Sequence, residues 1–270
     1  MSGRTVRLLA IGVVTGLAGG LLGVGGGFVM VPAMVYLMKT PQREANGTSL
    51  AVIVPVAIVG ATILGQGHQV DVQIGIVLAV GAVGGAVLGA RMTRRISDMG
   101  LRRAFGVVAV AAGLVMIADS VLRAVGGNVS VAGGLHPTGI SLWAMGLAVG
   151  VVAGVLSGLL GIGGGAIMVP AMTVLMGLSQ HLAQGTSLLV IIPTAISGSI
   201  THFRMGNIRM ETAAWLSAGG VLGAVGGAFL ALASPDALLR LLFGCYLAFT
   251  GIRMLRAPKT RITQPTMANR

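Results

Sequence analysis

Apolar residues occur along this 270-residue chain in eight long runs, which short polar connections separate. The runs are Leu8–Met38, Thr48–Gln66, Ile74–Ala90, Ala104–Leu122, Leu142–Leu178, Thr186–Thr201, Thr212–Ala233 and Leu238–Leu255. Six of them are close to the roughly 20 residues that a helix needs to cross the hydrocarbon core of a bilayer, and the first and fifth are longer. The pattern predicts an all-α integral membrane protein.

The composition supports this fold class and excludes several kinds of function. Hydrophobic residues make up 55% of the chain and charged residues 9%, whereas about 25% of a soluble domain is charged. None of the six acidic residues lies deep within an apolar run, which argues against an enzyme built on paired carboxylates. The single cysteine permits no intrachain disulfide, and no His, Cys, Asp or Glu cluster has metal-ligand spacing. We expect no enzyme activity, metal or cofactor.

The two longest runs contain nearly the same segment, 138 residues apart. GLLGVGGGFVMVPAM (Gly20–Met34) returns as GLLGIGGGAIMVPAM (Gly158–Met172), and the offset holds without gaps over Gly12–Ala124. Such internal duplication is common in membrane transporters. The predicted organisation is a first membrane repeat, a linker, a second membrane repeat and a disordered tail, at residues 1–125, 126–141, 142–256 and 257–270.

Glycines interrupt both long runs, at Gly23–Gly27 in the first. This cluster divides Leu8–Met38 into pieces of 15 and 11 residues, which as helices are about 22 and 17 Å long. Each piece reaches about half-way across the bilayer or somewhat further. The run is therefore either one broken crossing or a re-entrant pair that enters and leaves on the same side.

The positions of Lys and Arg distinguish these two geometries. If both long runs are single crossings, the 18 basic residues divide 10 to 8 between the two sides, and if both are re-entrant they divide 16 to 2. Cytoplasmic loops are enriched in Lys and Arg, so we expect both termini to be cytoplasmic and each repeat to have a re-entrant broken helix pair plus three transmembrane helices. That odd number of crossings inverts the second repeat. Because the net charge of +12 comes mainly from these loops, we expect no nucleic-acid partner.

The glycine clusters are the first predicted substrate-binding residues: Gly25, Gly26, Gly27, Gly163, Gly164 and Gly165. In the re-entrant geometry they lie near the midplane, where half-helices beginning at Phe28 and Ala166 point their N-termini. Free backbone N–H groups and the positive end of the helix dipole favour an anion there. Close helix packing through glycine is the alternative interpretation.

Hydroxyl residues follow each cluster in the sequence Gly-Thr-Ser-Leu, and they complete the predicted site: Thr48, Ser49, Thr186 and Ser187. Two interpretations stay open for them. They start the next helix as N-cap residues, or they donate a hydrogen bond to a bound oxyanion. A separate pattern, glycine at every fourth position, predicts tight helix packing at Gly81, Gly85 and Gly89 and at Gly219, Gly223 and Gly227.

The paired motifs make the chain similar to a known family. GLLGVGGGFVMVPAM followed by GTSL, and GLLGIGGGAIMVPAM followed by GTSL, resemble the TauE/SafE family of membrane permeases over about residues 5 to 256. The resemblance implies export of sulfite and of organosulfur anions such as sulfoacetate, with the glycine and Thr-Ser positions above as signature residues. Asn46 of the first copy becomes Gln184 in the second, so the site is not strictly symmetric.

These observations together predict a secondary transporter, an exporter, in the cell membrane. It binds a small anion at the midplane between the half-helix N-termini, and rocking of the inverted repeats alternates access. An anion channel with the same site and a non-transporting membrane scaffold are the alternatives. The expected partners are the small anion and the lipid bilayer. The sequence leaves open the substrate, the coupling ion, the direction of transport and the oligomeric state, including a homo-oligomer.

Overall fold

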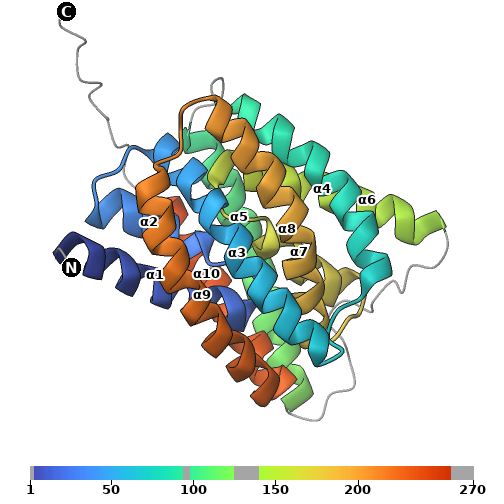
Figure 1. Ribbon diagram of the computed structural model, residues 1–270. Helices are drawn as coiled ribbons and strands as arrows, with labels where there is room; N and C mark the ends of the chain where they lie inside the picture. Colours follow the sequence, from blue (N-terminus) through green and yellow to red (C-terminus); the bar gives the residue numbers. More distant parts are fainter. Residues whose placement is uncertain (1–2, 94–97, 125–139, 257–270) are drawn as a thin grey trace, which may run out of the picture.

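The computed structural model describes residues 3–93, 98–124 and 140–256, and within these ranges the secondary structure is entirely helical (Figure 1). The elements are α1 Gly3–Leu22, α2 Gly27–Leu37, α3 Gln42–Gln66, α4 Val72–Met92, α5 Asp98–Ala124, α6 Ile140–Leu160, α7 Gly165–Pro170, the π-helix η1 Ala171–Leu175, α8 Gln180–Arg204, α9 Met210–Ala233 and α10 Asp236–Arg256. Seven are long and apolar enough to cross a membrane, namely α1, α3, α4, α6, α8, α9 and α10. The predicted all-α membrane protein is confirmed.

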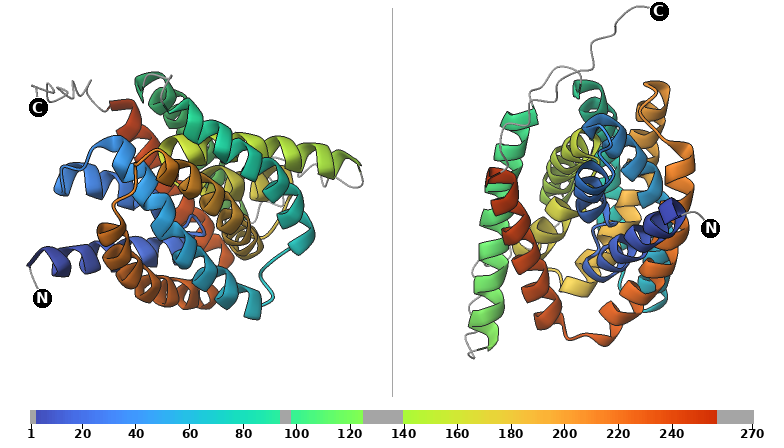
Figure 2. Two further views of the ribbon diagram at one scale, coloured as in Figure 1. Left: turned by 45° about the horizontal axis from the view of Figure 1, so that its top comes forward. Right: turned by 90° about the vertical axis from the view of Figure 1, so that its left-hand side faces the viewer.

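The helices pack in pairs that join the two halves of the chain. α1 lies along α9, α6 lies along α4, and α3 packs against α8. α5 and α10 lie side by side along one edge of the bundle (Figure 2, right). Each pair takes one helix from residues 1–125 and one from residues 142–256, so the halves share one core. The division into repeats stays a prediction. The predicted tail lies outside the described residues, and so does the predicted linker except for its last two residues.

Rows of glycine let two of these pairs approach closely. A Cβ on Gly16 of α1 would lie 2.0 Å from the Gly220 oxygen of α9, and a Cβ on Gly154 of α6 would lie 2.2 Å from the Ala82 oxygen of α4. The predicted rows make equivalent contacts, at Gly81, Gly85, Gly89, Gly219, Gly223 and Gly227. Backbones this close leave no room for a side chain. The predicted tight packing is confirmed.

The helix ends form two faces. At the amino-terminal face, the start of α1, the end of α2 and the turn before α9 line one hollow, to which Arg4, Arg7, Leu37, Met38 and Arg209 contribute. The Arg253 guanidinium near the end of α10 lies 5.5 Å from the centre of the Tyr36 ring at the same face. At the opposite face, the start of α8 meets the start of α10, where His181 contacts Asp236.

The chain breaks twice inside the bundle, at the predicted glycine clusters. Residues 23–26 separate α1 from α2, and residues 161–164 separate α6 from α7. The half-helices begin at Gly27 and Gly165, one residue earlier than predicted. Since both outer ends of the α1–α2 pair line the same hollow, α2 returns toward the face where α1 starts.

One predicted length is wrong. α1 begins at Gly3 and has 20 residues, rather than 15 from Leu8, and it is long enough to cross a membrane by itself. The physical reason is that hydropathy marks the part of a helix that lies in hydrocarbon. A helix continues beyond that depth wherever polar and basic residues such as Arg4 and Arg7 extend it into the headgroup region.

Candidate functional site

The two glycine breaks lie directly against each other inside the bundle. A Cβ on Gly27 would lie 2.7 Å from the Gly161 oxygen, and a Cβ on Gly165 would lie 2.8 Å from the Gly23 oxygen. These two contacts join residues at equivalent positions of the two copies. The structure therefore brings the two predicted glycine clusters together, although 138 residues separate them in the chain.

Each break is a turn that only glycine adopts easily. The backbone is left-handed, with φ between 69° and 81°, at Gly23, Gly25, Gly26, Gly161, Gly163 and Gly164. The turn leaves the N–H groups of Gly26 and Gly27 without a backbone carbonyl partner among the described residues, and the same holds for Gly164 and Gly165. All four residues are buried. Unpaired N–H groups at a helix start carry partial positive charge.

α3 and α8 form the walls around the breaks. Ile53 of α3 and Ile191 of α8 both contact glycines of both breaks. Ser49 precedes Ile53 by one turn, and Ser187 precedes Ile191 by one turn, so each serine shares a helix face with its isoleucine. Both serine hydroxyls are buried and have no hydrogen-bond partner within the described part of the chain. Such groups are uncommon in folded proteins and are available to a ligand.

Thr48 and Thr186 lie inside α3 and α8, which begin six residues earlier, so the interpretation as N-caps of these helices is wrong. The Thr48 hydroxyl oxygen accepts the N–H of Arg209 at 3.1 Å, and the Thr186 oxygen accepts the N–H of Asp71 at 2.8 Å. Arg209 and Asp71 are the N-cap residues of α9 and α4. Each threonine thus fixes the turn before a helix of the other half. The apolar run beginning at each threonine marks where the helix enters hydrocarbon, and the helix itself begins earlier.

Four amide side chains that were not predicted as part of the site extend the predicted serines into two polar rows. The α3 row consists of Gln42, Asn46 and Ser49, and the α8 row consists of Gln180, Gln184 and Ser187. The Asn46 amide donates to the Leu159 oxygen at 2.8 Å, and its own oxygen accepts from Gln42 at 2.9 Å. The amide atoms of Gln180 and Gln184 are buried and have no partner among the described residues. The spacing of four and three residues, which ends at the Gly-Thr-Ser-Leu motif, is the sequence signal that could have identified both rows.

His202, near the end of α8, is buried and lies outside the breaks. Its Nε2 lies 3.0 Å from the Gly158 oxygen of α6, and its Nδ1 lies 3.5 Å from the Asn207 amide in the turn before α9. These contacts give His202 a structural role in joining α6, α8 and that turn. Within the described ranges, no three His, Cys, Asp or Glu side chains are close enough together to hold a metal.

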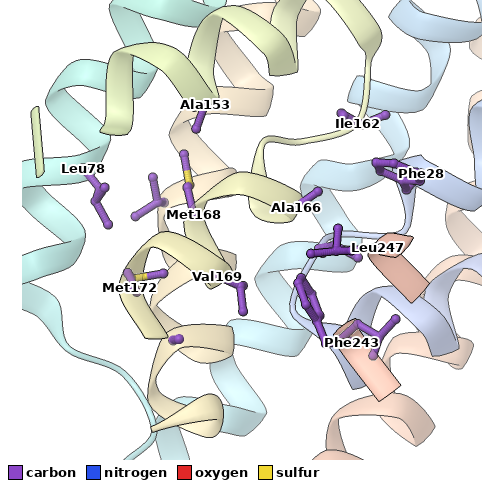
Figure 3. Packing of buried hydrophobic residues seen from close by; sticks show 14 of the residues in the cluster. Phe28, Leu78, Ala153, Ile162, Ala166, Met168, Val169, Met172, Phe243 and Leu247 are labelled. Atoms are coloured by element: carbon purple, nitrogen blue, oxygen red, sulfur yellow. The ribbon is translucent and has the colours of Figure 1, made fainter. Parts of the chain in front are cut away.

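A cavity of about 70 Å³ leads from the amino-terminal face toward the breaks. Its outer part is lined by Tyr36, Gln42 and Arg253, and its inner part by Phe28 and Ile162. Phe28 is the second residue of α2, and Ile162 lies within the second break; Figure 3 shows both side chains. The positive charge of Arg253 at the mouth favours the approach of an anion.

The sequence matches known membrane transporters along most of its length. Residues 2–116 and 146–270 match a family model described as "Sulfite exporter TauE/SafE". The chain is similar to "Probable membrane transporter protein YunE" of Bacillus subtilis, with 29% identity over 272 residues that cover 92% of this chain and 98% of the relative. It is also similar to YdhB of the same bacterium, with 26% identity and coverage of 87% and 94%. A third relative, MJ0441 of Methanocaldococcus jannaschii, is 26% identical, with coverage of 72% and 71%. The matched residues include both glycine breaks and both polar rows.

Proposed function

The chain belongs to the sulfite exporter TauE/SafE family, a family of membrane transporters rather than enzymes, and we propose that it exports a small anion such as sulfite, sulfoacetate or a related organosulfur anion. The seven candidate spans found among the described helices fit a multi-pass membrane protein. In this proposal the protein is a secondary transporter of the cell membrane. The anion binds between the two glycine breaks, and access to it alternates between the two faces.

The contact between the two breaks is the observation that carries the proposal. Two helix starts meet there, and the N–H groups of Gly26, Gly27, Gly164 and Gly165 have no backbone partner among the described residues. Several backbone donors together bind an oxyanion through charge-assisted hydrogen bonds. Partial charges of this kind hold an anion without a fixed buried cation, so they also permit its release.

The proposed binding residues fall into two groups. Gly25–Gly27 and Gly163–Gly165 supply backbone N–H donors, and side-chain hydroxyls supply the remaining donors, at Thr48, Ser49, Thr186 and Ser187. Each threonine oxygen already accepts an N–H, and its hydroxyl retains one proton to donate. Ile53 and Ile191 occupy the space beside Gly25 and Gly163, so in this proposal both isoleucines move aside when the anion enters.

We further propose that the two halves are inverted repeats with both termini in the cytoplasm. Corresponding contacts support the repeats, because Thr48 with Arg209 and Thr186 with Asp71 are the same pair of positions exchanged between the copies. The arginines of the amino-terminal face support a cytoplasmic location for that face. Alternating access then arises when one repeat rocks against the other.

Labelling of single cysteines in intact cells tests this topology. The native Cys245, which is exposed, is first replaced by serine. Pro41→Cys and Ser179→Cys then each place one thiol at an exposed turn, before α3 and before α8. An impermeant thiol reagent is expected to react at position 179 and to reach position 41 only after the cells are permeabilised. Reaction at 41, or protection at 179, would contradict the inverted arrangement.

Counterflow of radiolabelled sulfite in proteoliposomes tests the transport function. We expect saturable exchange that the double variant Ser49→Ala/Ser187→Ala weakens by about tenfold or more per serine, because a hydrogen bond to a charged group contributes roughly 1.5–3 kcal/mol. Neither serine hydroxyl has a hydrogen-bond partner to lose within the described ranges, so the variant should fold. Ser199→Ala is the control, since that hydroxyl donates to Ile196 in its own helix.

A thermal-shift series identifies the anion and separates the alternative functions. Sulfite, sulfate, thiosulfate, sulfoacetate, taurine and simple carboxylates are compared. An anion present at 100 times its Kd stabilises the folded protein by about 2.7 kcal/mol. A channel would give unitary currents without counterflow, and a scaffold would give neither flux nor stabilisation. Either result would replace the transporter proposal.

A further inference from the structure

We propose that the α8 row, Gln180, Gln184 and Ser187, lines the half of the substrate path between the glycine breaks and the opposite face, and that this structure holds that half closed. The inference rests on the transport function proposed above. It adds side-chain amides to the groups that select the anion, and it assigns a conformational state to the structure.

The α8 row connects the opposite face with the breaks. Its residues are spaced by four and three positions, which places them on one side of the helix. Gln180 is the first residue of α8. Gln184 lies against the first break, where a Cβ on Gly23 would be 2.6 Å from the Gln184 Cα and 2.9 Å from its Cγ. Ile191, one turn beyond Ser187, contacts glycines of both breaks.

The α8 row carries five side-chain nitrogen and oxygen atoms without a hydrogen-bond partner among the described residues. All three residues are 0% exposed. A buried amide or hydroxyl left unpaired destabilises the folded protein, whereas an apolar side chain of similar shape avoids this cost. The polarity of the row is explained by a second state in which water and the anion reach it. The amide N–H groups then replace water around the passing anion.

An ionic cluster, here called the Asp236 clamp, closes the outer end of this half. One carboxylate oxygen of Asp236 accepts the N–H groups of Gln180 at 2.6 Å and His181 at 3.2 Å. Arg240 donates to the other Asp236 oxygen at 3.3 Å and to Asp119 at 2.6 Å. The clamp ties the first turn of α8 to α10 and α5. Access from the opposite face therefore requires these contacts to separate.

Cysteine accessibility tests the path directly. In the Cys245→Ser background, Gln184→Cys is treated in membrane vesicles with an anionic, impermeant methanethiosulfonate on the side of the opposite face. The rate is measured with the clamp intact and with Asp236→Ala. Because loss of the clamp favours the open state, we expect the rate to rise by about tenfold, a population shift worth roughly 1.4 kcal/mol.

Leu188→Cys is the matched control. Leu188 is also 0% exposed on α8, but it packs against Gly60 of α3 rather than on the polar row. Its rate of modification is expected to stay unchanged when the clamp is removed. Equal rates at positions 184 and 188 in both backgrounds would overturn the inference.

A second variant gives an independent readout. Gln184→Leu removes an amide that has no partner in the described part of the chain, so the Tm should stay the same or rise, while the flux of radiolabelled sulfite falls about tenfold. Asn46→Leu removes two hydrogen bonds and should lower the Tm. A Tm loss for Gln184→Leu as large as that for Asn46→Leu, or an unchanged flux, would overturn this inference but would leave the proposed transport function standing. Absence of flux in the parent protein for every compound of the thermal-shift series would overturn the proposed function, and the inference with it.

Discussion

The two faces of the molecule hold their helices together by different ionic contacts. At the opposite face, the side chains of Arg240 and Asp119 pair at 2.6 Å and are only 6% and 8% exposed. At the amino-terminal face, Arg209 pairs with Glu44, and the two side chains are 48% and 30% exposed. Removing one partner of a buried ion pair strongly destabilises the folded protein, whereas a pair open to water contributes little to its stability. The difference indicates that the helices are held together firmly at the opposite face and loosely at the amino-terminal face.

The two polar rows show the same asymmetry. Gln42 of the α3 row lines the cavity that opens at the amino-terminal face, and Asn46 is hydrogen-bonded on both sides of its amide. Gln180 and Gln184 of the α8 row are buried without partners among the described residues. Equivalent positions of the two copies therefore lie in different surroundings, as the proposed alternating access requires of a conformation that is open at one face only.

The largest expected effect comes from breaking the buried pair. Asp119→Asn should lower the free energy of unfolding by about 3–5 kcal/mol, because Arg240 is left buried without its counter-charge. Denaturant unfolding in detergent measures the loss. The double variant Asp119→Leu/Arg240→Leu removes both charges and should recover much of the stability. A loss under about 1 kcal/mol for the single variant would show that the Asp236 clamp does not hold the helices firmly together.

The second effect compares the two glycine breaks. Gly26 and Gly164 both have φ of 78°, but a Cβ would lie 2.3 Å from the Thr15 oxygen in the first and 3.0 Å from the Ala153 oxygen in the second. Both alanine variants should lose about 1–2 kcal/mol through the left-handed backbone. Gly26→Ala should lose about 1–3 kcal/mol more through overpacking.

Thermal unfolding measures this difference between the breaks. Gly206→Ala provides the control, because Gly206 has φ of 72° and nothing within 4 Å of the added Cβ. Its Tm change therefore reports the cost of the left-handed backbone alone. Equal losses for Gly26→Ala and Gly164→Ala would contradict the closer packing of the first break.

The third effect is expected to be the same in both halves. Thr48→Val and Thr186→Val keep the side-chain shape and remove the oxygen that accepts the N–H of Arg209 or Asp71. Each variant should cost about 0.5–1.5 kcal/mol, because a half-buried N–H loses its hydrogen bond. Thr62→Val is the control, since its hydroxyl is exposed and donates within its own helix. Unequal Tm losses would mean that the asymmetry extends beyond the polar rows and the ionic contacts.

The smallest effect is expected at the exposed pair. Glu44→Gln should reduce the free energy of unfolding by at most about 1 kcal/mol, because water screens this contact. The loss should disappear in about 1 M salt, where the Debye length is near 3 Å. A large, salt-independent loss would contradict the description of the amino-terminal face as loosely held.

Much of the fold could be predicted from the sequence. The apolar runs predicted helices, the repeated clusters predicted both breaks, and the glycine spacing predicted the tight pairs; the motifs also identified the family. Helix starts could not be predicted in this way, because hydropathy reports depth in the bilayer. Thr48 begins an apolar run but lies well inside α3.

The candidate site was predictable only in part. The two glycine clusters were named from the sequence and do meet, but the polar rows depend on tertiary contacts. Asn46 and Gln184 occupy equivalent positions, and only the position of the Leu159 carbonyl, 113 residues away, makes Asn46 a partnered residue. No local sequence pattern predicts a contact between residues so far apart in the chain. The role of the site residues in binding stays a prediction for the experiments above.

The exchanged pairing of α1 with α9 and of α6 with α4 has a consequence for how the molecule can move. Each broken segment is anchored, along a row of glycines, to the half that did not supply it. If the halves rock as proposed, a tilt of either half pulls on the glycine turn of the other, and both turns change shape together. In that proposal, opening on one side and sealing on the other are a single mechanical event rather than two that need coordination.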